Sequence, residues 1–114
     1  AELPAKVIGQ ALQKADLTID DMDVIEINEA FAAVTLVSTK MLAGGDEAKW
    51  RKLLEKTNPN GGAIAIGHPV GASGGRILMT MMYELRRRGG GYGVCGICGG
   101  LAQGDACVIR VDGK

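Results

Sequence analysis

The sequence lacks the features that mark nucleic-acid-binding, membrane-spanning and disulfide-rich proteins. Thirteen Lys and Arg residues balance 13 Asp and Glu residues, so no basic surplus indicates a nucleic-acid or anionic membrane partner. No apolar run reaches about 18 residues, the length that a membrane-spanning helix needs. The N-terminal stretch has no apolar core of a signal peptide, and three cysteines, an odd number, do not make a secreted disulfide framework. We therefore expect a reducing compartment, the cytoplasm or an organelle matrix.

The chain is too short for two domains with a deep cleft between them. Its 114 residues are near the commonest size of one domain, and a hydrophobic content of 46% suffices for a moderate core. The helical pattern begins almost at once, so we expect residues 1–114 to be one domain of a longer protein.

Glycine is the residue type in excess, with 18 copies, most of them between residues 61 and 104. These glycines are interleaved with Ile, Val and Ala, which is not the composition of a flexible linker. Glycine inside apolar strands indicates that another part of the molecule approaches the backbone closely.

The spacing of apolar residues predicts four helices and four strands. The helices are expected at 5–15, 28–43, 46–56 and 71–88, and the strands at 24–27, 61–67, 91–98 and 105–111. Gly44-Gly45 should end the second helix, and Thr18 or Asp20 should cap a short turn. The order predicts an α/β fold, a layered mixed sheet covered by helices, whose last two strands form an antiparallel hairpin.

Polar residues stand at the ends of three predicted strands, where α/β sheets bind their ligands. Asn28 follows the first strand, His68 follows the second, and Cys98 ends the third. If these strands are parallel neighbours, the three side chains converge on one edge of the sheet. His68 is the only histidine, and a helix N-terminus close to it would keep its imidazole neutral and able to act as a base or a donor.

The cysteines also allow a structural zinc site, because Cys95, Cys98, Cys107 and His68 have the right types and number. Residues three apart on a strand point to opposite faces, however, which spoils chelation by the CxxC pair. We therefore expect no metal, and interpret Cys95 and Cys107 as small buried hydrophobic residues.

Two further motifs receive structural interpretations. The GxGxxG at 91–96 lies inside a predicted strand, whereas a dinucleotide-binding motif follows a strand and opens a helix. The basic run 86–88 closes a predicted helix, where cations meet the negative end of the dipole. Phosphate binding stays the alternative for that run.

Three blocks, in order, carry a resemblance to a known family. They are Asn28-Glu29-Ala30-Phe31-Ala32, the NGGAIAIGHPVGASG sequence of residues 60–74, and Cys98-Gly99-Gly100 followed by Gly104. Together they resemble the C-terminal domain of the thiolases, the acetyl-CoA acetyltransferases, over nearly the whole chain. The last block departs from the family pattern, because Leu101 and Ala102 replace glycines.

The resemblance implies that the protein is an enzyme and that this chain forms one half of the thiolase fold. Thiolases cleave 3-ketoacyl-CoA with CoA, or run the reverse Claisen condensation. The implied substrates are CoA thioesters and no further cofactor is implied. The nucleophilic cysteine of the family lies in an N-terminal domain absent from this chain, so the fragment alone is expected to be inactive. A homo-dimer or homo-tetramer is implied for the complete protein.

The resemblance also implies roles for five residues. His68 would activate the nucleophilic cysteine and contribute to an oxyanion hole, in which Asn28 would hold a water. Cys98 would be the acid/base that moves the α-proton. The backbone N–H of Gly100 would serve a second oxyanion hole, and Phe31 would line the pantetheine tunnel. The alternative function is a non-catalytic, thiolase-like lipid-carrier or scaffold domain.

Overall fold

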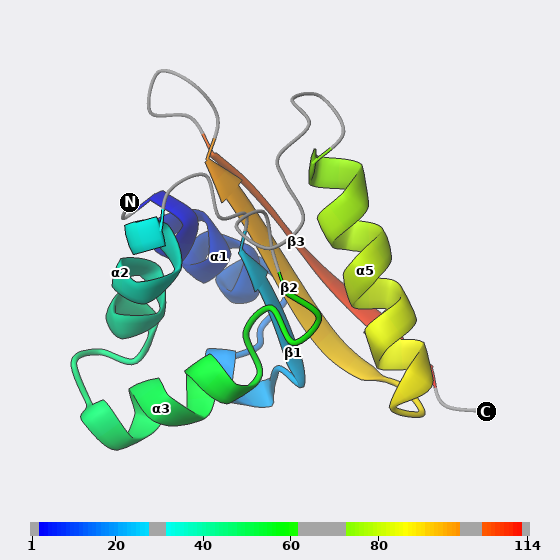
Figure 1. Cartoon of the computed structure of the whole chain (residues 1–114), viewed down its shortest axis with the longest axis horizontal. Helices are drawn as coiled ribbons and strands as arrows, with labels where there is room; N and C mark the ends of the chain where they lie inside the picture. The colour runs from blue at the N-terminus through cyan, green and yellow to red at the C-terminus, as the bar shows by residue number, and fades with distance from the viewer. Residues whose placement is uncertain (1–2, 28–31, 62–72, 99–103, 113–114) are drawn as a thin grey trace.

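The computed structural model describes residues 3–27, 32–61, 73–98 and 104–112 (Figure 1). Its elements are α1 (Leu3–Lys14), the 3-10 turn η1 (Ile19–Asp21), β1 (Val24–Ile27), α2 (Ala32–Leu42), α3 (Glu47–Glu55), α5 (Ser73–Arg87), β2 (Gly91–Cys98) and β3 (Gly104–Val111). The predicted α/β fold is confirmed, with element bounds within a few residues of those expected. The predicted strand at 61–67 falls almost wholly outside the described residues.

The sheet is mixed, as the sequence predicts, with the strand order β1-β2-β3. β1 runs parallel to β2, and its last residue, Ile27, lies opposite Gly96. β2 and β3 form the predicted antiparallel hairpin, from Gly91 opposite Val111 to Cys98 opposite Gly104. Parallel β1 and β2 end at the same edge of the sheet, where α/β proteins bind their ligands.

Helices cover both faces of the sheet (Figure 1). On one face Ile25 and Ile27 of β1 pack with residues of α1, α2 and α3. On the other face Val24 of β1 and Cys95 of β2 pack with Ile77, Met81 and Leu85 of α5. β1 is buried along its whole length because it receives helices on both sides, as parallel strands do.

Two glycines of β2 let helices approach the sheet closely, which confirms the expectation from the sequence. A Cβ at Gly93 would lie 2.7 Å from Met81 Sδ and 2.9 Å from Leu85 Cδ1, both of α5. A Cβ at Gly96 would lie 2.8 Å from Ile8 Cγ1 of α1. The two glycines thus serve opposite faces of the same strand.

The predicted helix signals are also confirmed. Thr18 is the N-cap of η1. Gly44, with a φ of +65°, follows the end of α2. Asp46 caps α3 by accepting a hydrogen bond from the backbone N–H of Lys49 at 3.0 Å.

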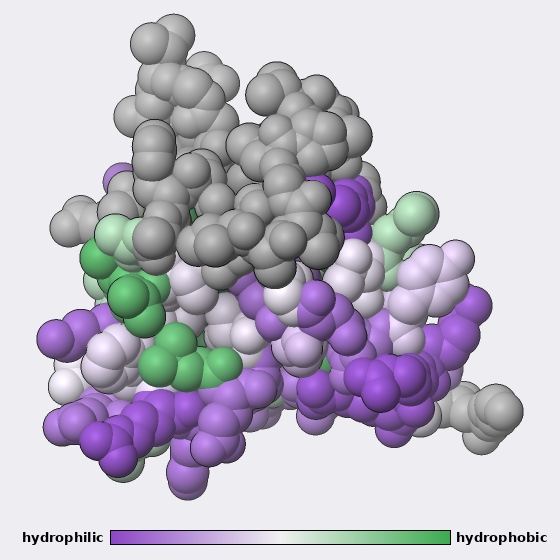
Figure 2. Space-filling view, in the orientation of Figure 1, coloured by the Kyte–Doolittle hydropathy of each residue, from purple (hydrophilic) through white to green (hydrophobic). Residues whose placement is uncertain are grey.

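The surface in Figure 2 is hydrophilic along its lower edge, over α3 and the C-terminal part of α5, and more hydrophobic over α2. Leu36 and Met41 of α2 are 53% and 47% exposed. Among the described residues, no helix combines the length and the apolar character that crossing a membrane requires.

Candidate functional site

The residues predicted to form the site fall largely outside the described part of the chain. Asn28, Phe31, His68 and Gly100 lie there entirely. The backbone of Cys98 is described and ends β2, opposite Gly104, but its side chain is not. Their convergence therefore stays a prediction.

The described flanks of these residues lie at one end of the sheet. Ile27, which precedes Asn28, ends β1 opposite Gly96, and β2 continues for two residues to Cys98. α5 begins at Ser73, five residues after His68, at the same end, which is uppermost in Figure 1. Three segments that carry predicted functional residues thus start or end on the same side of the molecule.

The segment that follows α3 runs beside β1 and extends its hydrogen bonding. The N–H of Ile25 donates to the carbonyl of Lys56 at 2.9 Å, and the N–H of Asn58 donates to the carbonyl of Ile25 at 2.7 Å. The side chain of Asn58 then bonds both backbone groups of Ile27. Its Oδ1 accepts from the Ile27 N–H at 2.9 Å, and its Nδ2 donates to the Ile27 carbonyl at 3.0 Å.

Asn60, two residues further, is bonded to a buried carboxylate of α5. Its Nδ2 donates to Glu84 Oε1 at 2.9 Å. The Glu84 side chain, 2% exposed, also pairs with Arg87 and, at 2.5 Å, with Arg88. Hydrogen bonds from Arg87, Arg88 and Asn60 lower the pKa of Glu84 from 4.5 to about 2, against the opposing effect of burial. Glu84 is therefore ionised at neutral pH.

The basic run 86–88 closes α5, as predicted, and also has a role that the sequence did not predict. Arg87 and Arg88 neutralise Glu84, and Arg88 also donates to the Asp23 carbonyl at 3.1 Å. Asp23 in turn accepts a hydrogen bond from the N–H of Tyr92 at 3.0 Å. This network joins the end of α5 to the amino ends of β1 and β2, so two of the three arginines serve specific pairs and not the helix dipole alone.

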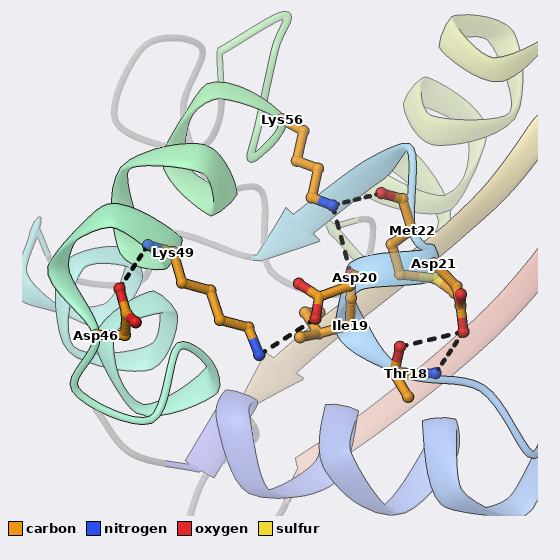
Figure 3. Close-up of polar contacts among 8 residues, drawn as sticks. All are labelled: Thr18, Ile19, Asp20, Asp21, Met22, Asp46, Lys49 and Lys56. Carbon is orange, nitrogen blue, oxygen red and sulfur yellow. Dashed lines mark hydrogen bonds and ion pairs between the residues drawn. The ribbon is translucent and has the colours of Figure 1, made fainter.

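A second polar cluster lies before β1, around η1 (Figure 3). Lys56 Nζ donates to the carbonyls of Met22 and Ile19 at 2.6 and 3.4 Å. Lys49 pairs with Asp20 at 3.3 Å. Both lysines come from α3 or its C-cap, so they tie that helix to the residues that lead into β1.

The two cysteines with described side chains differ. Cys95 is buried, as predicted, and burial, reinforced by Cys107 and Glu26, raises the pKa of its thiol to about 11. Cys107 is exposed, so the prediction that it is buried is wrong. It lies directly opposite Cys95 on β3, the edge strand of the described sheet. Within the described ranges, no group of three or more His, Cys, Asp or Glu residues could hold a metal ion.

No role was predicted from the sequence for Asn58, Asn60 or Glu84. The ELRRR sequence does indicate that Glu84 pairs with Arg87 and Arg88, because residues three and four positions apart meet on one helix face. Asn58 has a φ of +48°, a backbone region that asparagine tolerates better than most residues. That preference, and its place before Gly61-Gly62, indicate a turn but not the contact with β1.

The chain is similar to known thiolases. Residues 2–111 match the family described as thiolase, C-terminal domain. A probable acetyl-CoA acetyltransferase of Mycolicibacterium smegmatis is 55% identical over 94% of this chain and 26% of its own length. A beta-ketoadipyl-CoA thiolase of Acinetobacter baylyi is 48% identical over 94% of this chain and 25% of its own. The chain thus spans about a quarter of these relatives.

Solved structures show the same likeness. Human mitochondrial 3-ketoacyl-CoA thiolase in complex with CoA aligns with a TM-score of 0.82 and 48% identity, over 94% of this chain and 25% of that one. Peroxisomal 3-ketoacyl-CoA thiolase of Saccharomyces cerevisiae aligns with a TM-score of 0.80 and 38% identity, over 96% and 29%. The yeast enzyme is described as a five-layered structure built from two core domains of identical topology. The predicted thiolase-fold half is confirmed.

Proposed function

Because this chain belongs to the thiolase family, as its C-terminal domain, we propose that it forms part of an enzyme that cleaves 3-ketoacyl-CoA with CoA or runs the reverse Claisen condensation. The observation that carries the proposal is the family match over residues 2–111, which includes all three sequence blocks. The names of the relatives, acetyl-CoA acetyltransferase and beta-ketoadipyl-CoA thiolase, support the same reaction class. A neighbouring structure holding CoA supports CoA thioesters as substrates.

In the cleavage direction, a cysteine thiolate from the N-terminal part of the protein attacks the 3-keto carbon. The C2–C3 bond breaks, which leaves the acyl group on the sulfur and acetyl-CoA as its enolate. The enolate takes up a proton and leaves. The CoA thiol then gives its proton to the group that had protonated the enolate and attacks the acyl-enzyme, so that the shortened acyl-CoA forms and the cysteine thiolate leaves.

The residues of this chain take the roles that the family resemblance implies. His68 activates the nucleophilic cysteine and, with a water held by Asn28, stabilises the negative charge on the thioester oxygen. Cys98 gives the proton to the enolate, and the N–H of Gly100 contributes to a second oxyanion hole. Phe31 lines the path of the pantetheine. Each donor of this kind is worth about 3–4 kcal/mol of transition-state stabilisation.

Cys98, and not Cys95, is proposed as the acid/base. A proton-transfer group works best when its pKa lies near the working pH. Burial holds the pKa of Cys95 at about 11, so its thiol rarely gives up a proton at neutral pH. Cys98 ends its strand beside two glycines, at the edge where the other flanks gather.

The complete protein is proposed to work in the cytoplasm or an organelle matrix, as a homo-dimer or homo-tetramer. Catalysis needs the N-terminal part, because none of the three cysteines in this chain is a candidate for accepting the acyl group. The isolated chain is therefore expected to show no thiolase turnover. Measurable turnover by these 114 residues alone would contradict this proposal.

One assay tests the function: cleavage of acetoacetyl-CoA by CoA, with the full-length natural protein and its His68→Ala variant. Loss of the general base should lower the rate by about 10²–10⁴-fold. Circular dichroism and thermal unfolding of both proteins show whether the variant is folded. Equal rates would remove His68 from the mechanism, and an inactive full-length protein would favour the lipid-carrier or scaffold alternative.

A further inference from the structure

Asn58 connects two segments that carry predicted functional residues. Its side-chain amide forms a pair of hydrogen bonds with the backbone of Ile27, at 2.9 and 3.0 Å. Ile27 is the last residue of β1, and Asn28 follows it by one peptide bond. Asn58 itself opens the turn that leads into the block containing His68, and its carbonyl accepts a hydrogen bond from the N–H of Gly61 at 3.0 Å.

The geometry makes Asn58 a substitute for a strand residue. The backbone of residues 56–58 pairs with Ile25 as a parallel strand would. At Asn58 the backbone turns away, with a φ of +48°, and the side-chain amide continues the ladder to Ile27 in its place. Both backbone groups on this side of Ile27 are thus satisfied where β1 ends, in a place where Ile27 is only 1% exposed.

We propose that Asn58 is a positioning residue, which fixes the end of β1 relative to the turn at residues 58–61, and so sets the geometry of Asn28 and His68, which follow these two segments in the sequence. The proposal rests on the thiolase function for its activity readout. Asn58 touches no reacting atom. Its effect is to hold two backbone segments at one spacing, and misplacement of a catalytic group by about 1 Å is enough to cost about 100-fold in rate.

Asn58→Gly is the most specific substitution, because glycine accepts the left-handed backbone conformation and only the two side-chain hydrogen bonds are lost. In the full-length protein, kcat for acetoacetyl-CoA cleavage should fall by about 10- to 100-fold, with the KM for CoA almost unchanged. Thr57→Val is the matched control. It removes a buried hydrogen bond of the neighbouring residue to Leu53, at 2.5 Å, without touching Ile27. A kcat loss no larger than that of Thr57→Val would overturn the proposal.

Asn58→Asp adds a readout that a general loss of stability would not produce. In Asn58→Asp the ionised carboxylate would place an oxygen against the Ile27 carbonyl oxygen. This repulsion raises the pKa of the new carboxyl group above the ordinary value of about 3.9. Protonated, the carboxyl group can both donate and accept, as the amide does. The activity of Asn58→Asp relative to the natural protein should therefore recover several-fold as the pH falls from 8 to 5, whereas that of Asn58→Gly should not. Parallel profiles would contradict the proposal.

Hydrogen exchange separates this inference from the proposed function, because it needs no activity. In full-length Asn58→Gly, the amide of Ile27 should exchange at least several-fold faster than in the natural protein. The amide of Ile25, which donates to the backbone carbonyl of Lys56, is the internal control and should change less. Unchanged exchange at Ile27 would overturn the positioning role, even if the protein proves to be a thiolase.

Discussion

The two ends of the sheet are held by different kinds of interaction. At the amino ends of β1 and β2, a buried carboxylate, Glu84, pairs with two arginines, and Lys56 donates to the carbonyls of Ile19 and Met22. At the carboxyl ends, a neutral amide, Asn58, holds Ile27, and Gly96 admits α1 to the sheet. Charged groups thus stabilise the amino ends of the strands, whereas neutral hydrogen bonds and close packing hold the backbone at their carboxyl ends. Substitutions at the two ends should therefore separate stability from activity.

The largest effect is expected at the carboxyl end, from Cys98→Ala in the full-length protein. Without its acid/base, the rate of deuterium incorporation into C2 of acetyl-CoA in D₂O should fall by about 10²–10⁴-fold, with little change in thermal unfolding. Cys95→Ala is the matched control, because it removes a buried thiol of the same strand. Equal losses from the two variants would contradict the assignment of Cys98.

Packing at the same end is tested by Gly96→Val. The new Cβ would meet Ile8 of α1 at 2.8 Å, and overpacking of this kind costs about 1–3 kcal/mol in the free energy of unfolding. Gly9→Ala in α1 is the control, because nothing lies within 4 Å of its Cβ position. It should leave the stability unchanged or raise it by up to about 1 kcal/mol. Urea unfolding measures both, and equal stability of the two variants would refute the close approach.

At the amino end, Glu84→Gln should lower the free energy of unfolding at pH 7 by about 1.5–3 kcal/mol, the range for hydrogen bonds to charged groups. The pKa of Glu84 is lowered on folding, so its contribution is present above pH 4.5 and is lost as the pH falls from 4.5 towards 2. The stability difference between the natural protein and the variant should shrink over that window.

The exposed pair of Glu47 with Arg51, at 3.1 Å, is the control for Glu84. Glu47→Gln should change the free energy of unfolding by about 0.3–0.5 kcal/mol at most, as exposed helical pairs do. An effect of Glu84→Gln as small as this would show that the buried network does not stabilise the amino end. Turnover per folded molecule should be unchanged in Glu47→Gln.

The smallest effects concern the two lysines near η1. Lys49→Met removes an exposed pair with Asp20 and should cost about 0.2–1 kcal/mol or less. Lys56→Met removes two hydrogen bonds from a charged donor and should cost more, about 1–3 kcal/mol. Thermal unfolding of the two variants ranks them, and the reverse order would contradict the importance of the carbonyl contacts.

Local patterns in the sequence were sufficient for most elements. The VIEI run predicted β1, the Gly44-Gly45 pair predicted the end of α2, and Asp46 predicted the start of α3, all confirmed. These signals act within a few residues, because caps and apolar periodicity depend on neighbours along the chain. The burial of Cys107 was predicted wrongly for the complementary reason, since exposure depends on which strand stands at the edge of the described sheet.

The sequence by itself determined the element types, the glycine-rich blocks that mark the family, and the residues able to do chemistry. Only the tertiary structure decided that Asn58 bonds Ile27, 31 positions away, and that Asn60 bonds Glu84, 24 positions away. The physical reason is that helix and strand signals come from near neighbours, whereas a side-chain amide shows no preference for a partner until the fold brings one within hydrogen-bond distance.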